Sequence, residues 1–108
     1  MSYTVGLTAG AVQDLAELCG YIDSNDVPGK ADYVLGEIEK VLISLGENPN
    51  RRVYPGELSN LGIKEYREVL FKPYRIIFRV VDDRVFVLII ADGRRDMEVL
   101  LQSRLLGA

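Results

Sequence analysis

The sequence predicts an α+β fold with the element order β-α-α-β-β-β(-α), in which a mainly antiparallel sheet is packed on one face by an N-terminal helical hairpin. Two segments before residue 46 repeat their apolar residues at helical spacing. Three runs rich in β-branched and aromatic residues follow between residues 66 and 91, and two short turns separate them. A last helical pattern runs towards the C-terminus. At 108 residues, a single domain spanning residues 1–108 is expected.

The first strand and the first helix are expected at the N-terminus. Tyr3–Leu7 alternates as a short strand does, and Thr8 is a candidate N-cap because its hydroxyl can accept from the free amides of the first helical turn. Cys19 lies on the expected apolar face, so we interpret it as a buried structural thiol. The apolar face comprises Val12, Leu15, Ala16, Cys19 and Ile22, whereas Gln13, Asp14, Glu17 and Asp23 are expected to face away.

A second helix is expected over Lys30–Leu45, after a turn rich in Asp, Asn, Pro and Gly. Gly46 is a candidate for the left-handed position that ends many helices. The residues expected to be buried are Val34, Leu35, Ile38, Val41, Leu42 and Leu45.

The segment from Asn48 to Glu57 is polar and contains two prolines, which favours either a functional loop or a short extra turn. Arg51 and Arg52 in this segment have two open interpretations. They belong either to the solvated surface or to an anion site.

Three strands are expected over Tyr66–Phe71, Tyr74–Val81 and Arg84–Ala91, with turns at Lys72-Pro73 and Asp82-Asp83. If both turns have two residues, the cross-strand pairs can be written down. They are Phe71 with Tyr74, Val69 with Ile76, Arg67 with Phe78, Val80 with Val85, Phe78 with Val87, and Ile76 with Ile89. A three-residue first turn would instead move the first of these strands to the opposite face.

This pairing gives the sheet one apolar face, with Arg67 as its one charged residue, and we expect the helices to cover it. The apolar residues there are Val69, Phe71, Tyr74, Ile76, Phe78, Val80, Val85, Val87, Ile89 and Ala91. The other face mixes apolar residues with Arg75 and Arg79, a combination suited to a docking surface. Its members are Tyr66, Glu68, Leu70, Lys72, Arg75, Ile77, Arg79, Val81, Arg84, Phe86, Leu88 and Ile90.

Composition excludes several kinds of chemistry. The chain has no histidine and a single cysteine, which excludes His-based acid–base catalysis, Ser-His-Asp triads, zinc sites and an internal disulfide. We therefore expect no metal and no cofactor. No apolar run approaches the roughly 18 residues of a membrane span, and no secretory signal is visible, so we expect a cytoplasmic protein without membrane contact.

Charge is unevenly distributed along the chain. Residues 1–48 contain eight acidic residues and two lysines, a net charge of −6, and residues 49–108 contain eleven basic and eight acidic residues, a net charge of +3, which together give −3. We expect negative charge on the helices and positive charge beside the sheet, a distribution that could steer an anionic partner to one face.

Taken in order, these segments resemble the toxins of the ParE/RelE superfamily of plasmid-stabilisation systems, and the ParE branch more than the RelE branch. The resemblance covers essentially the whole chain. It is carried by Tyr3-Thr-Val-Gly-Leu-Thr8 with Ala11, Asp14 and Leu15, by Leu45 with Asn48-Pro49, by Gly62-Ile-Lys-Glu-Tyr-Arg67, by Tyr74-Arg-Ile-Ile-Phe-Arg-Val80, by Gly93-Arg-Arg-Asp96 and by Arg104-Leu-Leu106. The resemblance implies a toxin of a type II toxin–antitoxin module, neutralised by a cognate antitoxin.

Two departures from the RelE branch favour a protein target. In that ribonuclease branch a tyrosine near the C-terminus works with basic residues at the phosphate, whereas Leu101 falls roughly at that position here. The arginines could stabilise charge on a phosphate, but no group is evident to accept the proton from the attacking 2′-OH. The family is also commonly basic, whereas this chain has a net charge of −3.

The sequence thus favours a ParE-like toxin that poisons DNA gyrase through protein–protein contact, with no enzymatic chemistry and no direct DNA binding of its own. The candidate target- or partner-binding residues are Arg67, Arg75, Arg79, Arg94 and Arg95. Arg67 could instead pair with Glu65, Asp96 or Glu98 inside the fold, and Arg95 with Asp96 at a helix start. Two alternatives remain: a RelE-like endoribonuclease acting on ribosome-bound mRNA, and an inactive homologue that only binds an antitoxin.

Overall fold

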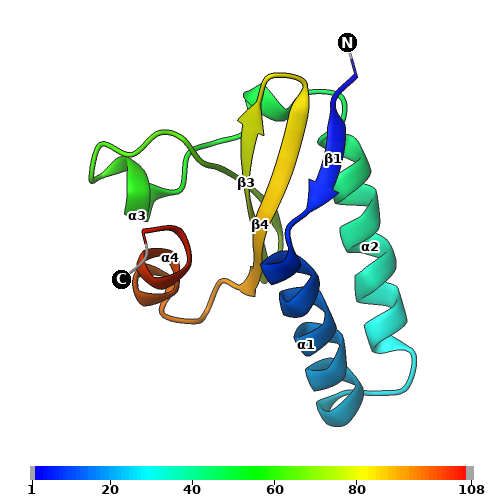
Figure 1. Ribbon diagram of the computed structural model, residues 1–108. Coiled ribbons are helices and arrows are strands. Elements are labelled where there is room, and N and C mark those ends of the chain that lie inside the picture. Colours follow the sequence, from blue (N-terminus) through cyan, green and yellow to red (C-terminus); the bar gives the residue numbers. More distant parts are fainter. Residues whose placement is uncertain (1, 107–108) are drawn as a thin grey trace.

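A computed structural model describes residues 2–106 and confirms the α+β fold (Figure 1). The elements are β1 (Thr4–Leu7), α1 (Ala9–Asn25), α2 (Lys30–Ser44), the 3-10 turn η1 (Pro49–Arg51), α3 (Gly56–Ser59), β2 (Arg67–Phe71), β3 (Tyr74–Val81), β4 (Arg84–Asp92) and α4 (Met97–Leu105). The strands form one sheet in the order β1-β4-β3-β2, in which β1 runs parallel to β4 and the other pairs are antiparallel. The helical hairpin α1–α2 lies on one side of the sheet, and α3 and α4 lie on the other (Figure 1).

Thr8 caps α1 as its sequence position predicts, because its hydroxyl oxygen accepts from the Ala11 amide at 3.3 Å. The apolar stripe of α1 is nevertheless rotated from the expected one. Val12 is 55% exposed and Ala16 is also exposed, so their expected burial is wrong. The stripe that packs on the sheet instead repeats at four, three and four residues, through Ala11, Leu15, Leu18 and Ile22.

The helix α2 packs through the residues that its periodicity predicts, except Leu35, which is only half-buried and lies in neither apolar cluster. Val34, Ile38, Leu42 and Leu45 are buried, and Val41 packs partly buried against the same cluster. The expected left-handed conformation of Gly46 is wrong, because the glycines with positive φ are Gly29 and Gly62. Gly46 is needed for close approach: a Cβ there would lie 3.2 Å from the carbonyl oxygen of Tyr3, whose amide donates to the Gly46 carbonyl at 2.8 Å.

The connection between α2 and β2 contains short extra turns, η1 and α3, one of the two alternatives that its length favoured. The hairpin β2–β3 has the two-residue turn Lys72-Pro73, and its register matches the expected pairs from Arg67 with Phe78 to Phe71 with Tyr74. Asp82, in the second turn, has a φ of 54°, as that turn requires.

A bulge in β4 changes the second half of the predicted register. Val80 pairs with Val85 and Phe78 with Val87 as expected, but Ile77 then pairs with Ile89, so that Leu88 is the extra residue. The expected pair of Ile76 with Ile89 is therefore wrong, since Ile76 lies opposite Ile90.

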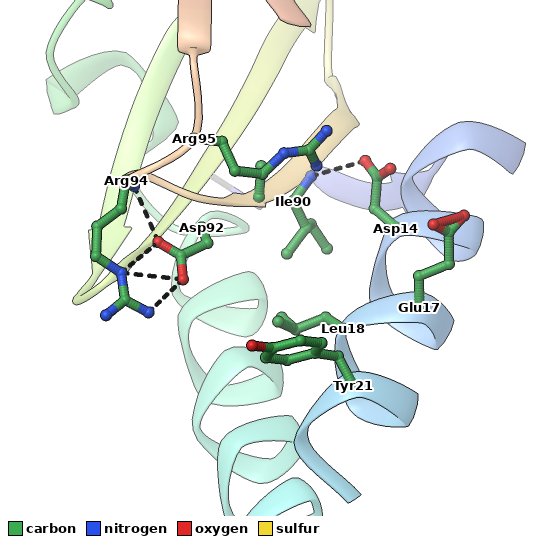
Figure 2. A pocket seen from close by; sticks show the side chains of 9 residues that line it. Asp14, Glu17, Leu18, Tyr21, Ile90, Asp92, Arg94 and Arg95 are labelled. Atoms are coloured by element: carbon green, nitrogen blue, oxygen red, sulfur yellow. Dashed lines mark hydrogen bonds and ion pairs between the residues drawn. The ribbon is translucent and has the colours of Figure 1, made fainter. Parts of the chain in front are cut away.

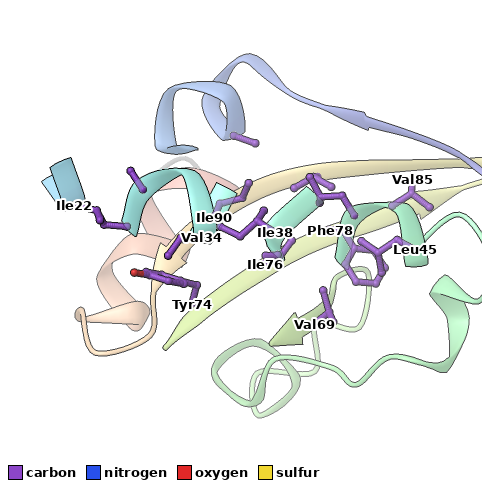
Figure 3. Packing of buried hydrophobic residues seen from close by; sticks show 14 residues of the cluster. Ile22, Val34, Ile38, Leu45, Val69, Tyr74, Ile76, Phe78, Val85 and Ile90 are labelled. Carbon is purple, nitrogen blue, oxygen red and sulfur yellow. The ribbon is translucent and has the colours of Figure 1, made fainter. Parts of the chain in front are cut away.

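The bulge divides the interior of the protein into two apolar clusters. Beyond it, Ile90 faces the helical hairpin, and Ile89 and Ala91 face the other side, the reverse of the prediction. The larger cluster lies between the hairpin and the sheet and includes Ile38, Ile76, Phe78, Val85 and Ile90 (Figure 3). The smaller lies between the opposite face of the sheet and α3 and α4, and contains Leu58, Ile77, Ile89, Ala91, Met97 and Leu101.

Two further findings concern the described residues as a whole. No helix formed by residues 2–106 is long and apolar enough to cross a membrane. The same residues contain no group of three or more Cys, Asp and Glu side chains placed to hold a metal ion.

Candidate functional site

The structure distributes the five predicted arginines over three places instead of one surface. Arg67 begins β2, Arg75 and Arg79 lie on β3, and Arg94 and Arg95 lie in the corner between β4 and α4. Their surroundings decide which of them can meet a partner.

Arg75 is enclosed by two carboxylates, which contradicts its expected surface position. Its Nε donates to Glu68 at 2.7 Å, and its two terminal nitrogens donate to both oxygens of Glu57 at 2.7 and 2.8 Å. The side chain is 14% exposed, and Glu68 is a buried charged residue. The hydrogen bonds to Glu57 raise the pKa of Arg75 further above its usual range, and the same bonds lower the pKa of Glu57 although its burial acts in the opposite direction.

Arg79 remains on the open part of the sheet, as predicted. Its side chain is half exposed, and its nearest carboxylate partner, Glu65, is 3.7 Å away. Across the sheet it pairs with Phe86, which is also exposed. An exposed pair at this separation contributes little stability, so Arg79 can be recruited by a partner.

Arg67 is half-buried, but it makes none of the expected internal ion pairs with Glu65, Asp96 or Glu98. Its guanidinium donates to the carbonyl oxygen of Arg52 at 2.8 Å and to the hydroxyl of Tyr54 at 3.1 Å. The reason is local: the connection that precedes β2 folds back along it, with Val53 forming an isolated antiparallel bridge to Glu68. The acceptors of the Arg67 guanidinium are therefore a backbone carbonyl and a tyrosine hydroxyl, and not the carboxylate that was expected.

The corner between β4 and α4 is tightly built around Gly93. A Cβ at Gly93 would lie 3.0 Å from Cδ of Arg75 and 3.1 Å from the carbonyl oxygen of Pro73, which also accepts from the Gly93 amide at 2.7 Å. Arg94 folds back onto Asp92, whose carboxylate accepts from both its amide and its Nε at 2.9 Å. This contact raises the pKa of Arg94 and lowers the pKa of Asp92.

Asp96 has a structural role different from the expected pair with Arg95. Its carboxylate accepts from the Val99 amide at 3.2 Å and so caps α4. Arg95 is exposed, and no carboxylate of residues 2–106 lies within ion-pairing distance of it.

A pocket of about 420 Å³ lies between α1 and this corner (Figure 2). Glu17 and Tyr21 reach it from α1, and Asp92, Arg94 and Arg95 stand on the corner side (Figure 2). Its remaining lining residues are Asp14, Leu18, Ile90 and Ala91. The pocket therefore combines an apolar wall, a tyrosine that is 68% exposed, carboxylates on the helix and a free arginine on the loop. Such a surface suits a protein segment with an aromatic or aliphatic residue beside an acidic one.

Arg104 is a residue whose role the sequence interpretation missed. Its Nη1 donates to Asp14 and its Nη2 to the carbonyl oxygen of Leu88, both at 2.8 Å, which joins α4 to α1 and β4. Asp14 also accepts from the Ile90 amide at 3.1 Å. Asp14 was expected to face away from the sheet, but it lies three residues after the buried Ala11. An acidic residue on the buried side of a helix needs a basic partner, and this position of Asp14 was the signal in the sequence that could have revealed Arg104.

Leu101 also has a structural position. It is fully buried in the smaller apolar cluster beside Met97 and Ile89. The position at which the resemblance led us to look for a tyrosine thus holds an aliphatic side chain packed into the interior. Cys19 packs partly buried against the larger apolar cluster, and its burial, helped by Asp23 and Asp32, raises the pKa of its thiol.

The fold is shared with solved toxins of toxin–antitoxin systems. A structure of the chromosomal ParDE system from Pseudomonas aeruginosa matches with a TM-score of 0.72 and 18% identity, over 84% of this chain and 96% of that chain. The RelBE2 complex from Mycobacterium tuberculosis matches with a TM-score of 0.59 and 18% identity, over 85% and 99%. A mutant of Escherichia coli RelE in the free state matches with a TM-score of 0.62 and 15% identity, over 99% and 97%.

The chain thus has the α+β fold of these ParDE, RelBE2 and RelE structures. The model of the ParE toxins of type II toxin–antitoxin systems matches residues 5–97. The chain belongs to this ParE toxin family. No curated protein sequence gives a significant match.

Proposed function

We propose that this chain is the toxin of a type II module that poisons DNA gyrase in the cytoplasm by protein–protein binding, and that a cognate antitoxin neutralises it. Membership of the ParE family and the shared fold with a ParDE toxin support the proposal. The observation that carries the choice of mechanism is the enclosure of Arg75 between Glu57 and Glu68.

This enclosure argues against phosphate chemistry on the sheet. A nuclease of the RelE kind needs unpaired positive charge at the scissile phosphate and a group that accepts a proton. Arg75 and Arg94 both form ion pairs with carboxylates of the chain itself. The aliphatic side chain of Leu101 cannot accept a proton and is buried. The side chains that remain exposed are suited to binding a protein and not to cleaving RNA.

We assign the main partner contact to the pocket between α1 and the Gly93 corner, with Arg79 as a second contact. Tyr21 offers a large exposed aromatic surface, and Arg95 offers a charge with no carboxylate of residues 2–106 within 4.0 Å of it. Aromatic and arginine side chains are the commonest sources of binding energy at protein interfaces. In this proposal the half-buried Arg67 and the enclosed Arg75 do not contact gyrase, and Arg94 acts through Asp92 to shape the pocket wall.

A supercoiling assay with purified gyrase tests the proposal. The full chain should inhibit supercoiling and accumulate cleaved DNA, and Arg95→Ala and Tyr21→Ala should each weaken inhibition by about tenfold or more. Lys40→Ala, which removes an exposed charge on α2, is the matched control and should inhibit as the parent does. Normal supercoiling at saturating toxin would refute the gyrase target.

A second candidate is the ribosome-dependent endoribonuclease, favoured by the fold that this chain shares with RelE. Codon-specific cuts in a ribosome-primed cleavage assay, with gyrase unaffected, would establish it instead. The third alternative, an inactive homologue, predicts unchanged growth when the chain is expressed without an antitoxin.

A further inference from the structure

Two basic side chains lie over the ring of Tyr54, which belongs to the connection between η1 and α3. The guanidinium carbon of Arg67 lies 4.5 Å from the centre of the Tyr54 ring, and Nζ of Lys64 lies 6.0 Å from it. Arg67 also holds the carbonyl oxygen of Arg52 and the Tyr54 hydroxyl. The side chain of Arg52 itself turns to the Ser44 hydroxyl, to which it donates at 3.1 Å. We call Tyr54, Lys64 and Arg67 the Tyr54 cluster.

The positive charges of the Tyr54 cluster are not matched by the chain. Among residues 2–106, no carboxylate oxygen lies within 4.0 Å of Arg52, Lys64 or Arg67. The two acidic residues nearest in sequence to Arg67 face other arginines, since Glu68 binds Arg75 and Glu65 faces Arg79. Two cations over one aromatic ring with no carboxylate in contact, in a chain whose net charge is −3, indicate an anion supplied from outside.

The apolar surface beside these cations indicates what kind of molecule carries the anion. Val53, next to Tyr54 in the chain, is 63% exposed although it is held in place by its bridge to Glu68. An aliphatic side chain beside cations and a tyrosine ring fits an acidic protein segment that also carries apolar residues. A phosphate backbone has no apolar group to cover Val53.

We propose that the Tyr54 cluster binds a carboxylate-rich segment of a protein partner, with the carboxylates against Lys64 and Arg67 and an apolar residue against Val53. This site is separate from the pocket beside Gly93, with which it shares no residue. It does not depend on gyrase being the target, because the unmatched charge and the exposed valine belong to this chain alone.

Fluorescence anisotropy with defined probes tests the proposal on the full chain. The first probe is a short labelled peptide that alternates Glu and Leu, the second replaces each Glu with Gln, and the third is a short labelled oligothymidylate. The Glu/Leu peptide should bind, and raising the salt from about 0.05 to about 0.5 M should weaken it. The Gln/Leu peptide should bind at least about tenfold more weakly.

Charge reversal separates the Tyr54 cluster from the rest of the basic surface. Lys64→Glu should weaken the Glu/Leu peptide by about tenfold or more, and because Lys64 is exposed the variant should unfold at the parent temperature. Lys72→Glu makes the same change at the other end of β2 and should bind as the parent does. The proposal is overturned if the peptide does not bind, if Lys64→Glu binds it unchanged, or if the oligothymidylate binds more tightly than the peptide. The gyrase assay is unaffected by any of these outcomes, so the two proposals fail separately.

Discussion

Arg75 joins three elements through one side chain, because from β3 it contacts Glu57 on α3 and Glu68 on β2. Replacing it with alanine would leave the buried carboxylate of Glu68 without a cation, a change that typically costs about 3–5 kcal/mol. We expect Arg75→Ala to lower the free energy of unfolding by that amount in urea titrations. Arg84→Ala, which removes an exposed arginine, should change it by less than about 0.5 kcal/mol. Equal stabilities of the two variants would contradict this role.

Glu57 should make the fold sensitive to acid. Its hydrogen bonds to Arg75 lower its pKa in the folded protein, so its contribution is complete above the unfolded glutamate pKa of about 4.3 and is lost as pH falls through the lower folded value. Asp92, whose pKa is lowered by Arg94, acts in the same direction. We expect the free energy of unfolding to fall below about pH 5, and less steeply in Glu57→Gln. If the free energy of unfolding falls equally steeply below about pH 5 in the parent and in Glu57→Gln, Glu57 does not cause the sensitivity to acid.

The sequence could assign each candidate arginine to an element but could not identify its contacts. The alternation of β3 correctly assigns Arg75 to the face of the sheet opposite the helical hairpin. Nothing in that pattern shows that Glu57 lies over it, so Arg75 was expected at the surface. Glu57 belongs to a four-residue helix whose sequence reads equally well as a loop. Contacts of this kind join positions far apart in the chain, so periodicity carries no information about them.

At the scale of elements, the helical hairpin and the strands follow from period and turn chemistry, whereas the bulge does not. Leu88 lies within a continuous apolar run, so no alternation marks where one residue is left over. The consequence is large, because every side chain of β4 beyond Leu88 changes face. The bulge puts Ile90 beside Asp14, whose carboxylate accepts from its amide, and it directs Ile89 and Ala91 towards α4.

The contact between α1 and α4 needs the small residue Gly10 as well as the ion pair between Arg104 and Asp14. A Cβ at Gly10 would lie 2.5 Å from Nη2 of Arg104, so Gly10→Ala should push the guanidinium away from Asp14 and Leu88. We expect this change to destabilise the parent by about 1–3 kcal/mol. In an Arg104→Ala background the same change should be neutral or stabilising by up to about 1 kcal/mol, because alanine is the better helix former.

Thermal and urea unfolding of the four proteins in this cycle measures the coupling between Gly10 and Arg104. A coupling of about 1 kcal/mol or more is expected for residues in direct contact. If Gly10→Ala has the same effect in both backgrounds, the close approach of Arg104 to α1 does not contribute to stability in solution.

At the scale of the whole molecule, the charge halves predicted from the sequence correspond to different parts of the fold. The eight acidic residues of positions 1–48 lie on α1, α2 and the short segments that flank them, and three of the eleven basic side chains of positions 49–108, those of Arg75, Arg94 and Arg104, are held closely by carboxylates. Positive charge that is already paired cannot displace counterions from DNA. The other eight basic side chains of this half belong to several separate strands, turns and connections, and not to one strand or helix; they are Arg51, Arg52, Lys64, Arg67, Lys72, Arg79, Arg84 and Arg95.

We therefore expect negligible binding of the chain alone to duplex DNA. Proteins with sequence-independent DNA affinity bind at about 10⁻⁴–10⁻⁶ M at physiological salt, and this chain should be weaker than that range in anisotropy measurements with a labelled duplex. If gyrase is the target, DNA should be retained only when gyrase is also present. Tight binding to the duplex alone, decreasing steeply with salt, would show that the net charge of −3 misrepresents the local surface. It would also make nucleic acid a direct ligand of the toxin.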